Sequence, residues 1–293
     1  MSSAPAPAAP DCDPPPRDPA PAARPLPAGT CDTHFHVFGA QGRYPMDARR
    51  SYTPHDATLD DYRLVMRAIG IERGVIVQPS VYGTDNRATL DALRAGRAAF
   101  RAIAVPAADT DDEALEEMHR LGVRGVRLNL LNPQVLGLDD ALAILRRMAH
   151  RGWHLQVLLD LGRDPGAVRT LCAKAGQPVV IDHMGKLAPS TRAHPLLEAL
   201  KAGDCWVKLS APYRVSAEPS PHADLTGLVR ALADANPERV VWGSDWPHTE
   251  LHHGTPSAAS LAEAVHAWFP DEALRRQICV VNPARLYGWG ETP

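Results

Sequence analysis

The sequence predicts a closed (β/α)8 barrel that follows a disordered leader. Eight short segments rich in Val, Ile and Leu have the length and composition of parallel strands buried on both faces. Amphipathic helical patterns lie between most of these segments, and such an alternation favours a barrel over other layer architectures. The eight expected strands cover residues 31–37, 74–78, 101–105, 125–130, 154–159, 178–182, 205–209 and 239–242.

The leader covers residues 1–28 and consists largely of Pro, Ala and Asp. Such a segment cannot bury enough apolar surface to offset the entropy lost on ordering. It also lacks the basic start and Leu-rich stretch of a secretory signal. We therefore expect a disordered leader and a single barrel domain over residues 29–293. The alternative is a short arm that packs on a partner subunit.

The helical segments carry recognisable start and stop signals. One runs over residues 58–66, begins at Thr58 with acidic residues in its first turn, and ends at Gly70. Others cover residues 111–121 and 138–151, each followed by glycine. An open doubly wound sheet is the alternative fold. It would carry a glycine-rich phosphate turn after the first strand, where this chain has two histidines.

Composition excludes several classes of partner. The net charge is −3 and no Lys/Arg cluster occurs, so neither nucleic acid nor a membrane surface is an expected partner. The longest apolar runs have only strand length, which excludes a transmembrane helix. The five scattered cysteines form no Cys-x-x-Cys pair, which fits a cytoplasmic protein without a thiolate zinc site. A homo-oligomer stays open.

Four side chains are the expected catalytic group. His34 and His36 lie at the end of the first strand, where alternate residues point to the same side. His183 follows the sixth strand and Asp245 follows the eighth. Because the carboxyl ends of barrel strands surround one active site, we expect these four to converge. Such a group suits water activation or the binding of one metal ion.

A second set of polar residues near the strand ends is expected to bind substrate. Arg127 lies in an apolar strand, and a buried guanidinium needs an anion, either a protein carboxylate or a substrate carboxylate. Arg214 follows the seventh strand and has the same two interpretations. The complete predicted substrate-binding set is Arg127, Arg214, Ser80, Tyr52, Asn129 and Gln156.

Four segments together resemble the amidohydrolase superfamily, in its amidohydrolase-related branch of TIM-barrel hydrolases. They cover residues 32–36, 181–186, 242–248 and 282–287. Within that branch, residues 78–86 and 127–129 are similar to 2-pyrone-4,6-dicarboxylate lactonase and to related sugar-acid and sulfomuconolactone lactonases. Residues 130–134 lack the further arginine that dicarboxylate lactonases carry there.

The resemblance also bears on metal binding. The superfamily places metal ligands at the histidine pair, at the middle strands, at a histidine on strand six and at the last-strand aspartate. Here Arg127, Asn129 and Gln156 stand at the middle positions, and the resembling pyrone lactonases work without a metal. No cofactor is therefore expected. The alternative is one zinc ion, held by His34, His36, His183 and Asp245.

The implied activity is that of a hydrolase that opens a small carboxylated lactone, in aromatic or sugar-acid catabolism. Asp245 would be the general base, and the three histidines would polarise the lactone carbonyl. One alternative is a zinc-dependent decarboxylase of the same superfamily. Another is a non-catalytic barrel that binds a small acid.

Overall fold

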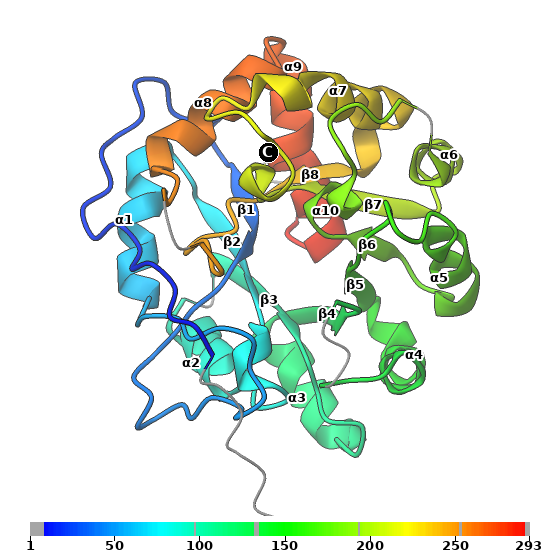
Figure 1. Cartoon of the computed structure of the whole chain (residues 1–293). Helices are drawn as coiled ribbons and strands as arrows, with labels where there is room; N and C mark the ends of the chain where they lie inside the picture. Colours follow the sequence, from blue (N-terminus) through cyan, green and yellow to red (C-terminus); the bar gives the residue numbers. More distant parts are fainter. Residues whose placement is uncertain (1–8, 97, 132–134, 193, 252–253, 291–293) are drawn as a thin grey trace, which may run out of the picture.

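Eight parallel strands follow one another in chain order around a single sheet (Figure 1). The computed structural model describes residues 9–290 except 97, 132–134, 193 and 252–253. The strands are β1 (Cys31–Phe35), β2 (Arg73–Val77), β3 (Phe100–Ala104), β4 (Val123–Asn129), β5 (His154–Leu158), β6 (Val179–Ile181), β7 (Cys205–Leu209) and β8 (Val240–Trp242). Hydrogen bonds from Asp245 N to His34 O and from His36 N to Trp246 O join the last strand to the first. The predicted closed barrel and all eight strands are confirmed.

Helices surround the barrel and are capped largely as the sequence indicates. They are α1 (Leu59–Ile69), α2 (Arg87–Ala95), α3 (Asp112–Leu121), α4 (Leu138–Arg147), α5 (Ala167–Ala175), α6 (Pro195–Ala202), α7 (Thr226–Ala235), α8 (Ala258–Trp268), α9 (Glu272–Arg276) and α10 (Asn282–Tyr287). Thr58 and Asp61 form a reciprocal capping box, and Gly70 ends α1 in the left-handed region. The helix predicted over 138–151 stops at Arg147, and a separate 3-10 turn fills the interval to Gly152.

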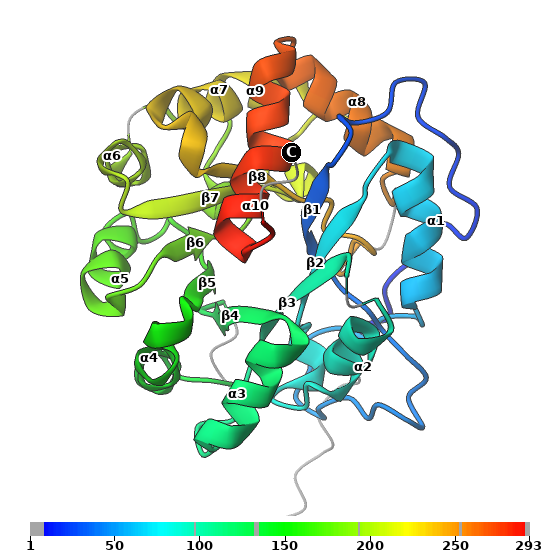
Figure 2. The same ribbon diagram turned by 180° about the vertical axis from the view of Figure 1, so that it is seen from behind.

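Helix α10 lies across the amino-terminal end of the barrel, as the view from behind shows (Figure 2). Tyr287 is fully buried there and belongs to a cluster with Cys31, Val75 and Ile103 from the first three strands. Because this end is plugged by side chains, a site at the carboxyl ends of the strands has access from the opposite side.

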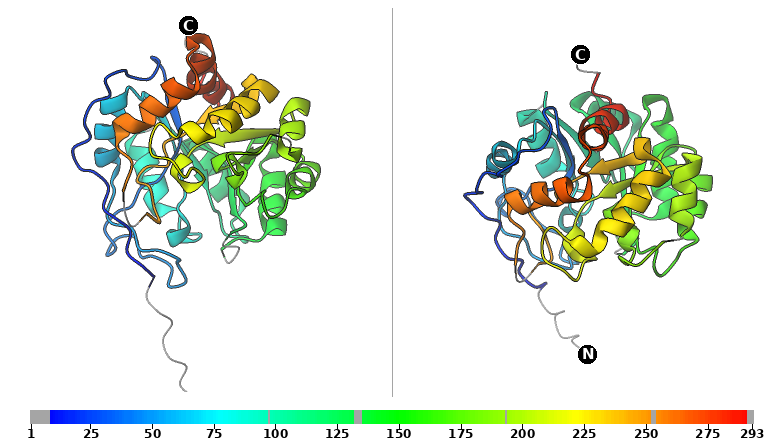
Figure 3. Two further views of the ribbon diagram at one scale, coloured as in Figure 1. Left: turned by 45° about the horizontal axis from the view of Figure 1, so that its top comes forward. Right: turned by 90° about the horizontal axis from the view of Figure 1, so that it is seen from above.

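The amino-terminal segment contacts the barrel where it is described. Residues 1–8 lie outside the described residues. From residue 9 to residue 28 the chain has no helix or ladder strand, yet it runs along the outside of the barrel near α1 and α8 (Figure 3). Backbone hydrogen bonds join Cys12 to Thr53 and Leu26 to Ile69, and both Cys12 and Leu26 are buried. These contacts hold the described part of the leader against residues that are distant in the sequence.

A buried aspartate and a glycine bring β1 and β8 together beneath the site. The Asp32 carboxylate accepts hydrogen bonds from His34 N at 2.9 Å, from Ser244 N at 2.9 Å and from the Tyr62 hydroxyl at 2.8 Å. Gly243 lies so close to β1 that a Cβ there would sit 2.7 Å from the Cβ of His34. The contacts fix the His34 strand against the loop that carries Asp245.

Within the described part of the chain, every helix is too short or too polar for a transmembrane span.

Candidate active site

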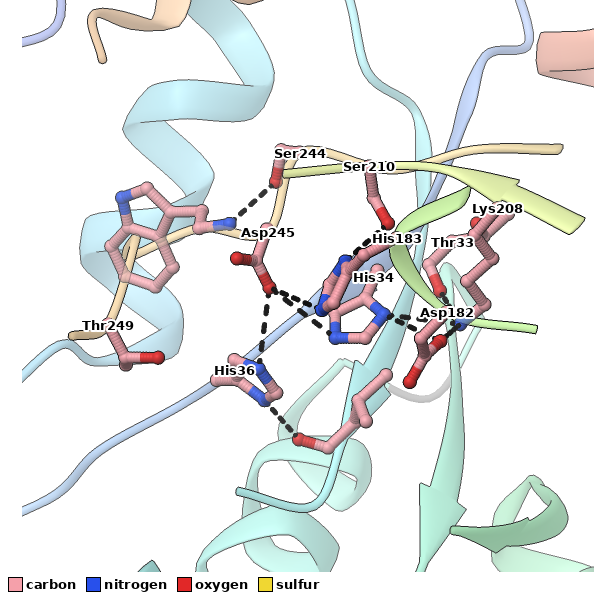
Figure 4. Close-up of polar contacts among 12 residues, drawn as sticks. Thr33, His34, His36, Asp182, His183, Lys208, Ser210, Ser244, Asp245 and Thr249 are labelled. Atoms are coloured by element: carbon pink, nitrogen blue, oxygen red, sulfur yellow. Dashed lines mark hydrogen bonds and ion pairs between the residues drawn. The ribbon is translucent and has the colours of Figure 1, made fainter. Parts of the chain in front are cut away.

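Three imidazoles surround one carboxylate oxygen at the carboxyl ends of the strands (Figure 4). Oδ1 of Asp245 lies 3.5 Å from Nε2 of His34 and 3.7 Å from Nε2 of both His36 and His183. All four side chains are at most 4% exposed. The structure therefore brings together the four residues that the sequence predicts as the catalytic group.

Two of these residues are held by backbone conformations that L-amino acids rarely adopt. Asp245 has φ of 60°, and His183 has φ of 51°. His183 opens a short left-handed turn that continues through Met184, Gly185 and Lys186, each with positive φ. Left-handed conformations cost non-glycine residues about 1–2 kcal/mol each, and such strain is concentrated at functional sites. The turn aims both His183 and Lys186 toward the same cavity.

The second oxygen of Asp245 is fully engaged by donors from the loop after β7. Oδ2 accepts the Tyr213 hydroxyl at 2.5 Å and Nε of Arg214 at 3.2 Å. Burial alone would raise the pKa of Asp245, but the charges of His183 and Arg214 hold it well below its usual value. Burial and the carboxylate raise the pKa of Tyr213 well above its usual value. Asp245 is thus an ionised acceptor, and only Oδ1 is free to face a ligand.

The hydrogen bond made by His36 fixes which of its ring nitrogens carries the proton. Nδ1 lies 2.7 Å from the carbonyl oxygen of Val77, and a carbonyl only accepts. Burial and the nearby Arg127 charge lower the pKa of His36 to about 4. At neutral pH the Nε2 atom therefore presents a lone pair to the site. In this neutral form Nε2 of His36 can accept a hydrogen bond or bind a metal ion, whereas donation to the lactone carbonyl would need a protonated ring.

The other two histidines have hydroxyl and ammonium groups behind them. Nδ1 of His183 lies 2.8 Å from the Ser210 hydroxyl. Nδ1 of His34 lies 3.4 Å from Nζ of Lys208 and 3.3 Å from Oδ1 of Asp182. At His34 the Asp182 carboxylate accepts and the Lys208 ammonium donates, so these two neighbours favour opposite tautomers. The Ser210 hydroxyl can donate to Nδ1 of His183, and that ring then carries its proton on Nε2, which faces Asp245.

Gln156 is not among the residues that line the cavity, which differs from its predicted role in binding substrate. Its Oε1 accepts a hydrogen bond from Lys208 at 2.7 Å, and its Nε2 donates to Asp182 at 3.1 Å. Lys208 also donates to Thr33 O at 2.7 Å. Both ends of the amide are thus used in a buried network below the histidines. Burial lowers the pKa of Lys208 to about 8, which leaves the ammonium largely charged at neutral pH.

A cavity of about 230 Å³ opens above the four catalytic candidates. The other five predicted substrate-binding residues all line it, and they are Tyr52, Ser80, Arg127, Asn129 and Arg214. Nη1 of Arg127 donates to Gln78 O at 2.9 Å, and no carboxylate lies within ion-pair distance of this arginine among the described residues. Arg214 differs, since it pairs with Asp245 and with Glu250. Of the two arginines, Arg127 is the one available to a substrate anion.

Comparisons with known proteins agree with this geometry. The model of the family described as amidohydrolase matches residues 31–289. The chain belongs to the amidohydrolase family. It is 36% identical to the 4-sulfomuconolactone hydrolase of Rhizobium radiobacter, over 95% of this chain and 96% of that protein. It is 32% identical to the 2-pyrone-4,6-dicarboxylate hydrolase of Comamonas testosteroni, over 91% and 92% of the two chains.

A solved structure of a probable lactone hydrolase is also similar to this chain. The probable 2-pyrone-4,6-dicarboxylic acid hydrolase of Acinetobacter baumannii, solved with citric acid bound, is 27% identical to this chain. The two align with a TM-score of 0.77, over 89% of this amidohydrolase and all of that chain. The resemblance that the sequence motifs indicate is therefore confirmed.

The donor set of this amidohydrolase fits a single metal ion. His34, His36 and Asp245 offer ligand atoms that lie within 4.8 Å of one another, and all three are buried. Nε2 of His34 and Oδ1 of Asp245 have no hydrogen-bond partner among the described residues. Ligand atoms about 2.1 Å from one tetrahedral ion would lie about 3.4 Å apart, close to the separations found here. A divalent ion held there would make bound water more acidic.

Sequence reasoning gave no role to four residues that shape the site. They are Asp182, Lys186, Lys208 and Tyr213. Asp182 and Lys186 flank His183 within one of the recognised motifs, and Lys208 is a charged residue inside an apolar strand. The charge of Lys208 within an apolar strand was the sequence signal that could have found this network, because a buried charge requires polar partners in the interior.

Buried neutral histidines should make the folded amidohydrolase sensitive to acid. Burial lowers the pKa of His248 to about 4 and that of His154 to about 3. In the unfolded chain both have a pKa near about 6.5, so below that pH the unfolded state binds more protons. Stability should then fall by about 1.4 kcal/mol per pH unit for each such histidine as the pH drops from about 6.5 to 4.

Thermal melting as a function of pH measures this loss. We expect the midpoint to fall steadily between pH 6.5 and 4.5, with a shallower slope in the variant His154→Leu. Neither ring nitrogen of His154 has a hydrogen-bond partner among the described residues, so this substitution removes a titrating group without breaking a side-chain hydrogen bond. A constant midpoint over that range would contradict the expectation.

Proposed function

We propose that this amidohydrolase opens the ring of a small acidic lactone by attack of water activated at Asp245. The carrying observation is the Oδ1 atom of Asp245, which faces three imidazoles and has no hydrogen-bond partner among the described residues. Asp245 lines the same cavity as Arg127. The predicted class of lactone hydrolase is confirmed by the names of the relatives. An acidic substrate is supported by citric acid bound in one relative.

The nucleophilic water would lie between two acceptors. Oδ1 of Asp245 and Nε2 of His36 are 3.7 Å apart, and both present lone pairs. One water molecule can donate a hydrogen to each, which directs its own lone pair away from them and toward the substrate. In this arrangement Asp245 takes the proton as the water oxygen bonds to the lactone carbonyl carbon.

Charge that develops on the carbonyl oxygen needs donors. His183 supplies one in the tautomer with the proton on Nε2, in which the Ser210 hydroxyl donates to Nδ1. His34 supplies a second in the tautomer with its proton on Nε2, in which Lys208 donates to Nδ1. An aspartate with a low pKa is a weak base in the resting site. As negative charge grows on the carbonyl oxygen of the substrate, this oxygen competes with Asp245 for the histidine donors and for Arg214. The proton affinity of Asp245 therefore rises.

Ring opening completes the balance of atoms. The tetrahedral carbon expels the ring oxygen, and that oxygen receives the proton held by Asp245. The carbon–oxygen bond of the ring breaks, a new carboxylic acid forms, and the acid then releases its proton to solvent. The substrate carboxylate is held throughout by Arg127, with Ser80, Asn129 and the neutral phenol of Tyr52 as further polar contacts at the cavity wall.

This route requires no metal. Arg127 and Lys186 line the cavity without an ion-pair partner among the described residues, and their positive charges weaken the binding of a divalent ion beside them. We therefore expect activity to survive dialysis against a strong chelator, and added zinc not to raise it. Hydrolysis of 4-sulfomuconolactone and 2-pyrone-4,6-dicarboxylate, followed by ultraviolet absorbance beside metal analysis of the same sample, measures this.

Two results would overturn parts of the proposal. Activity that is lost with chelator and restored by one equivalent of zinc would assign the histidines and Asp245 as metal ligands. Release of carbon dioxide without ring opening would make the protein a decarboxylase instead.

A further inference from the structure

The leader joins two loops that line the cavity. The loop after β1 contributes Ser51 and Tyr52 to the lining, and the loop after β8 contributes Thr249 and Glu250. Residues 10–13, here called the strap, make hydrogen bonds to both loops. The strap therefore connects two parts of the cavity wall that are far apart in the sequence.

Main-chain hydrogen bonds attach the strap to the loop after β1 at Thr53. The N–H of Cys12 donates to Thr53 O at 2.9 Å, and the N–H of Thr53 donates to Pro10 O at 2.8 Å. Between these two contacts, Asp11 forms an isolated parallel bridge with Thr53. Tyr52, the neighbour of Thr53, lines the cavity and is buried. The strap thus fixes the backbone directly beside a residue of the cavity wall.

Two further hydrogen bonds attach the strap to the loop after β8. The N–H of Glu250 donates to Sγ of Cys12 at 3.2 Å, and the N–H of Asp13 donates to Leu251 O at 3.0 Å. Cys12 is buried, and burial raises the pKa of its thiol. The sulfur at this contact is therefore a neutral acceptor at neutral pH.

The loop after β8 needs contacts from outside because its backbone is strained. Asp245, His248 and Glu250 have φ of 60°, 65° and 62°. Left-handed conformations are unfavourable for residues other than glycine, so the surrounding structure must hold them. Farther along the leader, Pro16 and Pro19 line a small cavity together with His248. The leader thus contacts the strained loop at two places.

Arg214 connects this loop to the proposed general base. Its Nη1 donates to Oε2 of Glu250 at 3.1 Å, its Nη2 to Thr249 O at 2.8 Å and its Nε to Oδ2 of Asp245 at 3.2 Å. A displacement of Glu250 therefore moves the guanidinium that orients the Asp245 carboxylate. The main-chain N–H that binds Cys12 belongs to this same glutamate.

We propose that the strap positions the active site, with Cys12 holding Glu250 and, through Arg214, the Asp245 carboxylate. This rests on the proposed hydrolysis of a lactone at Asp245. Cys12 does not line the cavity, so it is a positioning residue. Its loss should affect turnover more than substrate binding, because the proposed anchor of the substrate, Arg127, belongs to β4.

Kinetics of full-length variants test the proposal. Cys12→Ala removes the sulfur acceptor. We expect its kcat on 4-sulfomuconolactone to fall about tenfold and its KM to stay within about twofold, since a displacement of about 1 Å costs up to about a hundredfold in rate. Cys12→Ser keeps an acceptor and should retain most of the activity. Cys279→Ala removes a buried thiol that does not line the cavity, and it should leave kcat unchanged.

A double-mutant cycle tests the route through the glutamate. Glu250→Ala removes the contact with Arg214 but keeps the main-chain N–H that binds Cys12. If the strap acts through Glu250, Cys12→Ala lowers kcat less in the Glu250→Ala background than in the wild type, because residues in one chain of contacts are not additive. Full additivity, or a KM that rises as much as kcat falls, would overturn the proposal.

Hydrogen–deuterium exchange provides a readout without turnover. In Cys12→Ala the amide of Glu250 loses its acceptor, so peptides that contain this residue should exchange several-fold faster than in the wild type, with β7 unchanged. Unchanged exchange at Glu250 would overturn the proposal. Faster exchange, in a protein whose wild type opens no lactone, would contradict the proposed function and support the strap. If Cys12→Ala melts far below the wild type, Cys12→Val replaces it.

Discussion

Asp245→Asn is expected to lower kcat by about a thousandfold while the fold and the KM for acidic lactones are retained. General-base catalysis contributes about 10²–10⁴-fold, and an amide cannot accept the proton from water. The side chain keeps its shape, and its oxygen can still accept from Tyr213 and Arg214 as Oδ2 does now. Steady-state kinetics on 4-sulfomuconolactone, beside a thermal melting curve, measures both effects.

A surface substitution of the same kind provides the control. Asp234 is exposed on α7, and Asp234→Asn should leave activity and stability unchanged. If Asp245→Asn kept activity within about tenfold of the wild type, Asp245 would not be the base. A collapse of the fold would instead indicate that the carboxylate mainly holds the strained loop after β8 in place.

Arg127→Met is expected to raise the KM for acidic lactones about tenfold or more, with a smaller change in kcat. Charge-assisted hydrogen bonds are worth about 1.5–3 kcal/mol, and a single contact of this kind accounts for at least that factor. Arg127 is 6% exposed and donates to Gln78 O, so methionine fills most of its volume but leaves one carbonyl without that donor.

The matched variant is Arg127→Lys, which keeps the charge but loses the planar pair of donors. Its KM should lie between those of the wild type and Arg127→Met. An unchanged KM in both variants, with normal melting behaviour, would exclude Arg127 as the anchor of the substrate carboxylate.

Local patterns were sufficient to predict the barrel. Each strand was an apolar run of the right length, and caps such as Thr58 and Gly70 marked helix ends independently of the rest of the chain. The contacts of residues 9–28 could not be predicted, since they are bonds to Thr53 and Ile69, far along the sequence. Nothing in a Pro/Ala composition identifies such distant partners.

The catalytic group was predictable because the fold places every strand end at one rim. Four polar residues at three strand ends must meet there once the barrel closes. Their hydrogen bonds were not predictable in the same way. The neutral form of His36 depends on the position of Val77 O, and the engagement of Arg214 depends on the loop that carries Glu250. Both follow from backbone geometry that residue types alone do not determine.

Hydrolysis in ¹⁸O-labelled water tests the central claim most directly. If water activated at Asp245 attacks the lactone carbonyl, the new carboxylate of the product carries one ¹⁸O atom, and the oxygen released from the ring carries none at the moment of cleavage. Fragmentation of the product in a mass spectrometer locates the label, and carboxylate oxygens do not exchange at neutral pH on this time scale. If the label were found only on the alcohol oxygen of the product, water would have attacked the ring carbon that carries this oxygen instead of the carbonyl carbon. That result would contradict the account.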